Sequence, residues 1–559
     1  MSEQTLRWQL MWTRLLAVVE EQAQTLVRTA FGTATREAGD LSAGVFLPDG
    51  RMLAQAVTGT PGHVNAMAGS VAHFLREFPA ETMRAGDAYL SNDPWLCTGH
   101  LFDMTLVSPV FDAGGRLLAL FASTLHVVDI GGIGPGPDAS EIFHEGLFIP
   151  ILRYASAAGV DRGVRALIRA NVRYPDEVEG DLAALRACNE VGARRLAAML
   201  AEFGEAALEP LGGFIIERSR RAMEQAIAAW PRGVYRHRLQ MDGFDGQTLS
   251  LQAELRLLGE RIEVDYAGSA AALPRGINVP LPYTEAYTSF GLRCLIGAGV
   301  PNNAGSLAAI RVEAPSGSIL NAPPPHAVNA RHVTGQLLPD LMFGCLRQAR
   351  PEAVPAEGAA SLWNINLAGQ RRLEDGGRRR FAITSFSTGG TGGRPRQDGL
   401  STTAFPSGVR NVSIEILEAS APLLFWRKEY RPDSGGAGRQ RGGLGQVIEV
   451  QHAQEDEPLL LAASWERWVH APRGAEGGAD GATGSARLLP SGEALRGKGR
   501  QTIPAGQRLQ VLTPGGAGLG PAAERDPAAL AADLRAGLVS PAAARAAYGA
   551  IPQHNKEDL

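Results

Sequence analysis

The chain has 559 residues, which is too long for a single hydrophobic core and predicts two to four domains. Hydrophobic residues make up 45%, charged residues 20% and the net charge is −4, so a globular protein is indicated and nothing points to nucleic acid or an anionic membrane as a partner. The 67 glycines and 35 prolines favour long loops and many turns over a helical bundle.

The cysteines and the N-terminal segment indicate the cellular compartment of the protein. Four cysteines occur and none belongs to a CxxC pair, which argues against a zinc ribbon or a dithiol redox site. So few cysteines in a long chain fit a reducing cytoplasm. The N-terminus lacks a basic start followed by an uninterrupted apolar core, and no run of about 18 uncharged apolar residues occurs. We therefore expect a cytoplasmic protein without a signal peptide or a transmembrane helix.

The first predicted element is an amphipathic helix over residues 5–36, with apolar side chains at helical spacing. The next segment, DLSAGVFLPDGRMLAQAV, has two apolar runs around a Pro-Asp-Gly turn and predicts a β-hairpin. A helix over 64–78 and a strand over 87–91 follow. Residues 104–127 are predicted to form a second hairpin that turns at 112–115. The Gly- and Pro-rich residues 131–141 are expected to form a loop over a site.

The predicted secondary structure of the rest of the chain changes along its length. Residues 163–230 are predicted to be helical, and residues 234–266 to form short strands. A loop then enters a helix within 272–299, and the Pro- and Asn-rich residues 298–335 are expected to lie against a surface or cleft. After residue 446, short apolar runs between Gly-rich turns predict strands, and the tail predicts two helices.

The predicted fold class is therefore mixed α/β (α+β) and multidomain. We expect a metal-binding α/β domain at 1–160, a helical segment at 161–232, an α/β domain with cleft loops at 233–400, and a β-rich C-terminal domain with a helical tail at 401–559.

A possible metal site lies on the hairpin over 104–127. His100 precedes Asp103 by three residues, His126 ends the returning strand, and Asp129 follows it by three. An imidazole at the end of an apolar strand is costly to bury without a partner. Asp40, just before the first hairpin, could reach the same point, and two His with two carboxylates suit zinc, manganese or iron. The alternative is a set of hydrogen-bonded loop residues, because His-x-x-Asp is common by chance.

Other polar residues near this segment have both a functional and a structural interpretation. Glu141 or Glu145 could act as a general base beside a metal, although solvated surface glutamates are the more common case. His63 precedes a predicted helix, where a capping or core role is favoured. Asp93, in Asn-Asp-Pro, is favoured as a turn former.

Two Gly-rich loops raise the possibility of a phosphate site. Residues 389–393 and 434–445 have neither the spacing of a P-loop nor a strand–GxGxxG–helix context. Arg439 and Arg441 could still bind an anion, but a structural turn is favoured. No GxSxG elbow is present, and no cysteine lies beside a plausible base, so neither a serine-hydrolase triad nor a cysteine nucleophile is supported.

Several motifs in one order resemble the hydantoinase B/oxoprolinase family along nearly the whole chain. They include DLSAGVFLPDGRMLAQ, PGHVNAM, NDPWLCTGHLFD, HVVDIGG and EIFHEGLFIP, followed by PSGSILNAPPPHAVNARHVTG and SGGAGRQRGGLG. The resemblance implies a metal bound by Asp40, His100, Asp103 and His126. It implies that Asp129 orients His126, as carboxylates often do beside metal-bound imidazoles.

The chain departs from the family pattern at Trp95–Thr98 and in a short loop after His126. Both departures are expected to line the substrate pocket, and His63, Asp93 and Trp95 are the candidate substrate-binding residues. The family's substrate preferences therefore do not carry over.

The resemblance implies a subunit of an ATP-dependent cyclic amide hydrolase that opens hydantoin, 5-oxoproline or lactam rings. A hydantoinase A-type partner would bind ATP and phosphorylate the substrate, and the two would form a hetero-oligomer. The lack of a convincing nucleotide site in this chain agrees with that division. The alternatives are a subunit of an ATP-dependent ketone carboxylase of the acetone or acetophenone type, and a non-catalytic assembly subunit. The chain's length, which is that of hydantoinase-type subunits, favours amide hydrolysis.

Overall fold

The computed structural model describes residues 2–549, and this part of the chain divides into two compact units. The first runs to Arg236 and also contains Gln252–Leu338 and Gly408–Arg410. The second contains His237–Leu251, Pro339–Ser407 and the chain from Asn411 onward. This division cuts across the four segments expected from the sequence, because residues 161–232 pack within the first unit. Residues 550–559 of the expected C-terminal domain lie outside the described residues.

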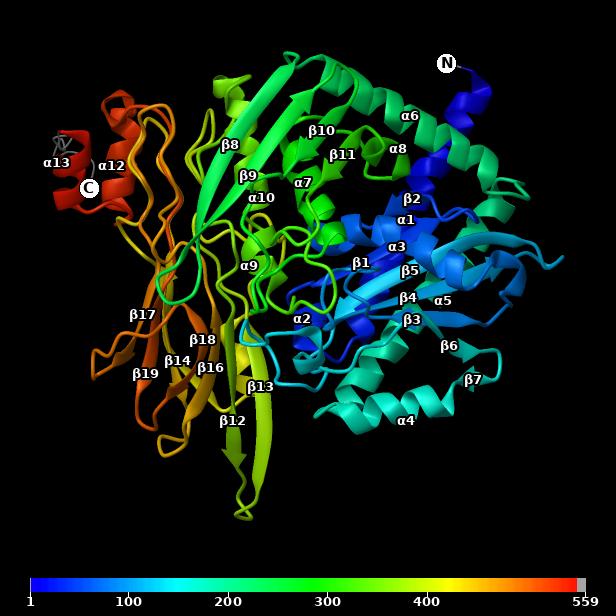
Figure 1. Ribbon diagram of the computed structural model, residues 1–559, viewed down its shortest axis with the longest axis horizontal. Helices are drawn as coiled ribbons and strands as arrows, with labels where there is room; N and C mark the ends of the chain where they lie inside the picture. Colours follow the sequence, from blue (N-terminus) through cyan, green and yellow to red (C-terminus); the bar gives the residue numbers. More distant parts are fainter. Residues whose placement is uncertain (1, 550–559) are drawn as a thin grey trace. The chain divides into compact units, whose positions relative to one another are not determined.

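The first unit is built on a seven-stranded sheet of order β2-β1-β5-β4-β3-β6-β7 (Figure 1). All the strand pairs of this sheet are antiparallel. The predicted hairpin at its centre is confirmed, and its register places Asp103 directly opposite His126. The strands are β1 (Leu41–Phe46), β2 (Met52–Gln55), β3 (Ala88–Ser91), β4 (Asp103–Phe111), β5 (Leu117–His126), β6 (Leu152–Ser156) and β7 (Gly159–Val160).

Helices cover both faces of this sheet, because alternate side chains of its strands are apolar on each face. Val45 and Phe121 pack with residues of α1, α5 and α6, whereas Phe46 and Leu120 pack with residues of α3. Tight turns and short helices connect these elements. The helices are α1 (Glu3–Thr29), α2 (Thr33–Arg36), α3 (Pro61–Glu77), η1 (Ala80–Thr82), η2 (Ile142–His144), α4 (Arg162–Asn171), α5 (Pro175–Glu202) and α6 (Glu209–Ala228).

The helix predicted over 5–36 is interrupted between α1 and α2. The buried carboxylate of Asp181 accepts hydrogen bonds from the backbone N–H groups of Phe31 and Gly32, at 2.8 and 3.0 Å. These N–H groups bond to a side chain instead of continuing the helical ladder. The predicted helical stretch over 163–230 likewise consists of three helices, α4, α5 and α6.

The chain leaves the first unit within β8 and returns within β9, two strands of a sheet of order β11-β10-β9-β8. The helix α7 that follows packs on α3. The close approach requires glycine at position 62, because a Cβ there would lie 2.8 Å from ring atoms of Tyr283 and Tyr287. These elements are β8 (Gly233–Asp242), β9 (Thr248–Leu257), β10 (Ile262–Asp265), α7 (Leu281–Leu295), α8 (Ala304–Leu307), β11 (Ile310–Glu313) and α9 (Arg331–Gly335).

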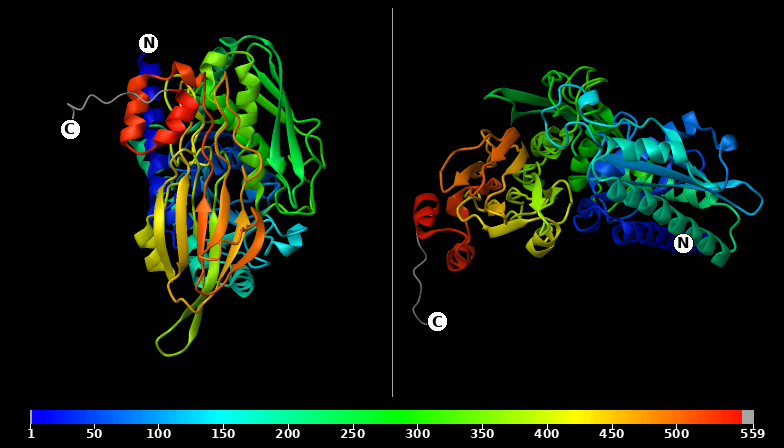
Figure 2. Two further views of the ribbon diagram at one scale, coloured as in Figure 1. Left: turned by 90° about the vertical axis from the view of Figure 1, so that its left-hand side faces the viewer. Right: turned by 90° about the horizontal axis from the view of Figure 1, so that it is seen from below.

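The second unit is rich in strands, as predicted, and ends in two short helices. Its two four-stranded sheets have the orders β13-β12-β16-β18 and β14-β15-β19-β17, and their yellow and orange strands run side by side in Figure 2 (left). Its elements are α10 (Leu338–Arg347), η3 (Pro351–Ala353), β12 (Ile365–Arg372), β13 (Arg378–Ser385), α11 (Ile414–Ser420), β14 (Leu423–Tyr430), β15 (Gln446–His452), β16 (Leu459–Ser464), β17 (Ser485–Leu489), β18 (Lys498–Ile503), β19 (Arg508–Leu512), η4 (Ala522–Glu524), α12 (Pro527–Arg535) and α13 (Pro541–Tyr548).

The Gly-rich loops of this unit pack backbone against backbone. A Cβ at Gly516 would lie 1.9 Å from the carbonyl oxygen of Thr391, so only glycine fits there. Arg441 pairs with Asp533 at 3.1 Å, and Arg439 pairs with Glu524 at 3.1 Å. Because both arginines already have carboxylate partners, the structural interpretation of these loops is favoured over a phosphate site.

No helix within residues 2–549 is long and apolar enough to cross a membrane.

Candidate metal centre

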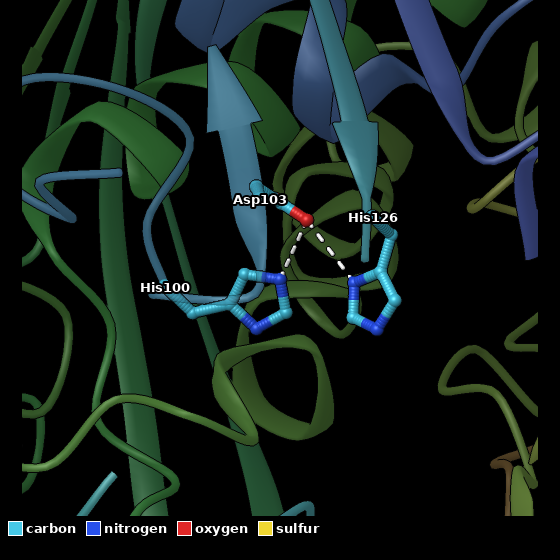
Figure 3. A group of neighbouring side chains, drawn as sticks. All are labelled: His100, Asp103 and His126. Carbon is cyan, nitrogen blue, oxygen red and sulfur yellow. Dashed lines mark hydrogen bonds and ion pairs between the residues drawn. The ribbon is translucent and has the colours of Figure 1, made fainter. Parts of the chain in front are cut away.

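Three side chains of the β4–β5 hairpin and the loop before it converge on one point. Candidate ligand atoms of His100, Asp103 and His126 all lie within 4.8 Å of one another. Figure 3 shows the two imidazoles turned toward a single oxygen of Asp103. The hairpin register explains this arrangement, because it sets Asp103 opposite His126 and leaves His100 three residues before the strand.

Asp103 is completely buried and uses both carboxylate oxygens. Its Oδ1 lies 2.7 Å from His100 Nε2 and 3.1 Å from His126 Nδ1. Its Oδ2 accepts from Arg331 at 2.6 Å and lies 2.9 Å from His63 Nε2. Burial alone would raise the pKa of Asp103, but the surrounding His100, His63 and Arg331 hold it well below its usual range. Asp103 is therefore an anion at the centre of the cluster.

The hydrogen bond on the far side of His100 fixes its tautomer. His100 Nδ1 lies 3.0 Å from the backbone carbonyl oxygen of Asn329, which can only accept, so Nδ1 carries the hydrogen. Burial and the Arg331 charge lower the pKa of His100 to about 3, so the ring is neutral near pH 7. The Nε2 lone pair consequently faces the Asp103 carboxylate, which is also an acceptor. A neutral imidazole nitrogen and a carboxylate oxygen that lie side by side form a donor set that suits a divalent metal.

His126 is the most solvent-accessible member of the three-residue group. Its side chain is 24% exposed, whereas the side chain of Asp103 is fully buried. The ring stacks on Phe102, with an interplanar angle of 12°. The stacking holds the imidazole in place while leaving one edge open, which suits a centre that must admit a small molecule.

His63 and Asp40 lie next to this trio. His63 contributes no helix cap; it lies in α3 with Nε2 toward Asp103, and its Nδ1 is 3.6 Å from Asp40 Oδ1. That Nδ1 is buried without a hydrogen-bond partner. Burial opposes protonation of His63, but Asp103 and Asp40 together raise its pKa. Asp40, the fourth predicted ligand, therefore lies beside His63 and outside the three-residue group.

The sequence interpretation missed Arg331, at the start of α9. Its guanidinium donates to Thr98 O at 2.7 Å, lies 4.1 Å from the ring centre of Tyr283, and binds Asp103. Glycine is required at position 99, where φ is +96° and a Cβ would lie 2.7 Å from Arg331. The only indication in the sequence was the expectation that residues 298–335 lie against a surface or cleft.

The neighbouring His332 was missed as well. Burial and the positive charge of Arg331 lower the pKa of His332 to about 3, and the Nε2 of this imidazole is buried without a partner. No sequence pattern distinguished His332 from the other histidines, because it belongs to no short motif with a metal-ligand spacing.

The two candidate general bases lie in different environments. Glu141 is 44% exposed and lies 3.5 Å from His144. Glu145 is fully buried, and its Oε1 accepts from the backbone N–H groups of Val328 and Asn329. Within residues 2–549, neither carboxylate has a hydrogen bond to the His100, Asp103 and His126 group, so the structure does not support either as a base acting there.

Asp129 has a different partner from the one expected. Its Oδ1 accepts from the guanidinium of Arg173 at 2.7 Å, and its Oδ2 accepts from the backbone N–H of the same residue. Among the described residues no hydrogen bond joins Asp129 to His126. A role in orienting His126 is therefore not supported, because both oxygens are used to tie the loop to Arg173.

Asp93 and Trp95 have local structural contacts. Asp93 accepts from the Trp95 backbone N–H at 2.8 Å, as a turn former does, and burial raises its pKa. The Trp95 indole N–H donates to the carbonyl oxygen of Ala322 at 2.8 Å, so this side chain is already held in place. Their suggested contact with substrate stays a prediction.

The family model for hydantoinase B/oxoprolinase matches residues 4–522. The chain belongs to this family. Among the relatives of this hydantoinase B/oxoprolinase chain, the caprolactamase subunit beta of Pseudomonas jessenii is 30% identical, covering 96% of this chain and 94% of the relative. The 5-oxoprolinase 1 of Arabidopsis thaliana is 27% identical over 91% of this chain, but this chain spans only 41% of that protein.

Two solved structures resemble the fold of this family member. The ATP-dependent caprolactamase of Pseudomonas jessenii superposes with a TM-score of 0.88 at 26% identity, covering 99% of this chain and 97% of the other. A nucleotide-free acetone carboxylase superposes with a TM-score of 0.84, covering 98% and 80%; at 19% identity this likeness concerns the fold alone. The mixed α/β, multidomain architecture predicted from the sequence is thereby confirmed.

Proposed function

We propose that this chain is the metal-binding subunit of an ATP-dependent cyclic amide hydrolase, which opens a hydantoin, 5-oxoproline or lactam ring. The substrate is activated by a hydantoinase A-type partner that uses ATP, and the two chains form a hetero-oligomer. The observation that carries the proposal is the convergence of candidate ligand atoms of His100, Asp103 and His126 within 4.8 Å of one another, a donor set that suits a divalent cation. The relatives named as caprolactamase and 5-oxoprolinase support the substrate class.

The proposed division of labour follows from the chemistry of the substrate. Resonance stabilises a cyclic amide against direct attack by water. Phosphorylation of the amide oxygen by the partner gives an imidate-type phosphate whose carbon accepts water readily. Water adds to that carbon, and cleavage of the C–N bond with protonation of the departing nitrogen opens the ring and leaves an acyl phosphate. A second water hydrolyses the acyl phosphate to a carboxylate and inorganic phosphate. A zinc, manganese or iron ion held by His100, Asp103 and His126, with Asp40 as the proposed fourth ligand, would supply Lewis acidity and an activated water for the first of these two steps.

The residues of this chain have assignable tasks in that scheme. Asp103 supplies the negative charge that retains a cation, and Arg331 with His63 holds its other oxygen. His126 forms the accessible edge through which substrate arrives. His63 has a raised pKa and its Nδ1 lies 3.6 Å from Asp40 Oδ1, so it can hold a proton there, and we assign to it the transfer of that proton to the departing nitrogen.

The proposal is tested by co-expressing the chain with its A-type partner and measuring ATP-dependent ring opening of hydantoin, 5-oxoproline and caprolactam. We expect turnover of at least one of them and coupled release of phosphate. His100→Ala should lower turnover by at least about 10²-fold while leaving the complex assembled. ATP consumption that requires a ketone and bicarbonate would contradict the hydrolase and assign a carboxylase instead. Unchanged turnover in His100→Ala would indicate a non-catalytic assembly subunit.

A further inference from the structure

Glu145 is buried and binds one short segment of backbone. Its Oε1 accepts from the N–H of Val328 and from the N–H of Asn329, each at 2.7 Å. Its own position is fixed, because its backbone N–H donates to Ile142 O at 3.0 Å and a Cβ at Gly132 would lie about 2.5 Å from its backbone. A rigid carboxyl group thus holds the peptide unit that joins Val328 to Asn329.

The segment that Glu145 holds is the one that orients His100. The carbonyl oxygen of Asn329 lies 3.0 Å from His100 Nδ1. That carbonyl shares a planar peptide unit with the N–H of Ala330, which donates to Gly276 O at 2.7 Å. The Asn329 side chain donates to Gly134 O at 3.1 Å. Both peptide units that flank the Asn329 Cα are therefore fixed, one by Glu145 and the other by Gly276.

We propose that Glu145 is a positioning residue for His100: by holding the Val328–Asn329 backbone it aims the Asn329 carbonyl at Nδ1 and keeps the Nε2 lone pair directed at the metal centre. The proposal rests on the proposed function. In place of the expected general-base role, Glu145 then acts through two contacts. Its carboxyl group binds the Val328–Asn329 backbone, and the Asn329 carbonyl in turn binds the His100 imidazole. Groups that orient a metal-bound imidazole typically contribute about 10–100-fold to metal affinity.

To hold the Val328–Asn329 backbone, Glu145 needs only an oxygen that accepts hydrogen bonds, and a negative charge is not necessary. Burial raises the pKa of Glu145 to about 8, so the neutral acid still offers its carbonyl oxygen to the two N–H groups near pH 7. Glutamine offers the same oxygen, whereas alanine or leucine offers none. A general base, in contrast, needs the ionised carboxylate, which glutamine cannot provide.

Asp181 provides a matched control within the same unit. It is also buried, it also accepts from two consecutive backbone N–H groups, those of Phe31 and Gly32, and its Oδ2 also lacks a partner. Its peptide segment carries no hydrogen bond to His100. Asp181→Ala should therefore reproduce the loss of stability caused by Glu145→Ala without its effect on metal binding.

The experiment measures the dissociation constant for Mn²⁺ and Zn²⁺ of the full-length chain carrying Glu145→Gln, Glu145→Ala, Glu145→Leu or Asp181→Ala. We expect Glu145→Gln to stay close to the unsubstituted chain, Glu145→Ala and Glu145→Leu to bind about 10–100-fold more weakly, and Asp181→Ala to be unchanged. In the metal-free chain, the ¹⁵N shifts of His100, assigned by their absence in His100→Gln, should show Nδ1–H in Glu145→Gln and a mixture of tautomers in Glu145→Leu.

Several results would overturn the proposal. They are unchanged metal affinity in Glu145→Leu, equal losses in Glu145→Leu and Asp181→Ala, or a Glu145→Gln chain that keeps the metal but loses ring-opening activity. If the alanine and leucine variants do not fold, the metal affinity of Glu145→Gln and the His100 tautomer in that variant still test the proposal. Failure of the unsubstituted chain to bind any divalent metal would contradict the proposed function, whereas the tautomer measurement would still test the positioning role of Glu145.

Discussion

His100 Nε2 lies 2.7 Å from Asp103 Oδ1, and a neutral imidazole that donates through Nδ1 to the Asn329 carbonyl presents its Nε2 lone pair to that oxygen. A hydrogen-bonded loop, the alternative interpretation of His-x-x-Asp, would place a donor at one of these two positions. The Asn329 carbonyl oxygen, which can only accept, instead favours the hydrogen of His100 at Nδ1. This relationship is the geometric basis of the proposed metal site.

Arg331 should be needed for the stability of the buried cluster. Arg331→Met removes a guanidinium that binds Asp103 Oδ2 at 2.6 Å and leaves a completely buried carboxylate with less compensation. We expect the free energy of unfolding of the metal-free chain to fall by about 3–5 kcal/mol. Arg116→Met, at an exposed pair with Asp112, should cost at most about 1 kcal/mol. Urea denaturation of both variants measures the difference. Equal losses of unfolding free energy would contradict a larger stabilising contribution of the buried Arg331–Asp103 pair.

Asp181 should make stability depend on pH. Burial raises its folded pKa from 3.8 to about 6, so the folded chain holds this proton more tightly than the unfolded chain. The resulting stabilisation is fully present below about pH 4 and is lost as the pH rises through about 6. Relative to Asp181→Asn, which cannot titrate, the unsubstituted chain should lose about 3 kcal/mol of unfolding free energy between about pH 4 and pH 7. A constant difference across this range in chemical denaturation would contradict the assignment.

Glycine packing should limit substitution in the second unit. In Gly516→Ala the new Cβ would meet the Thr391 carbonyl oxygen at 1.9 Å, so backbone must move. We expect a loss of about 3 kcal/mol or more, measured as a lower thermal unfolding midpoint. Gly213, inside α6, has nothing within 4 Å of the position that a Cβ would occupy, and Gly213→Ala should raise stability by about 0.5–1 kcal/mol. Similar behaviour of the two variants would argue against tight backbone packing in the Gly-rich loops.

The strand and turn patterns of the sequence were enough to predict the element that carries the site. A turn signal at 112–115 between two apolar runs predicted β4 and β5, and the antiparallel register of that hairpin then places Asp103 beside His126. The interruption after α1 could not be predicted, because it depends on Asp181, which lies far along the chain. Local periodicity contains no information about such a contact.

The difference between local patterns and distant contacts also explains which residues of the site were predicted. His100, Asp103 and His126 share a short stretch of sequence, and the spacing of ligand types was visible there. Arg331 and the Asn329 carbonyl reach the cluster from more than two hundred positions away. The pairing of Asp129 with Arg173 could not be predicted either, because the position of Asp129 beside His126 in the sequence contains no information about Arg173. The convergence of these three side chains was thus predictable, and the contacts from distant parts of the chain were not.

The measurement that tests the central claim most directly is the metal content of the purified full-length chain, determined by elemental analysis after reconstitution with zinc, manganese or iron and removal of free ion. We expect about one tightly bound ion per chain, lost in His100→Ala and in Asp103→Asn but kept in Asp112→Asn, a carboxylate in the turn of the same hairpin. A chain that retains no ion under these conditions, or whose His100→Ala variant retains as much as the unsubstituted chain, would contradict the proposed metal site.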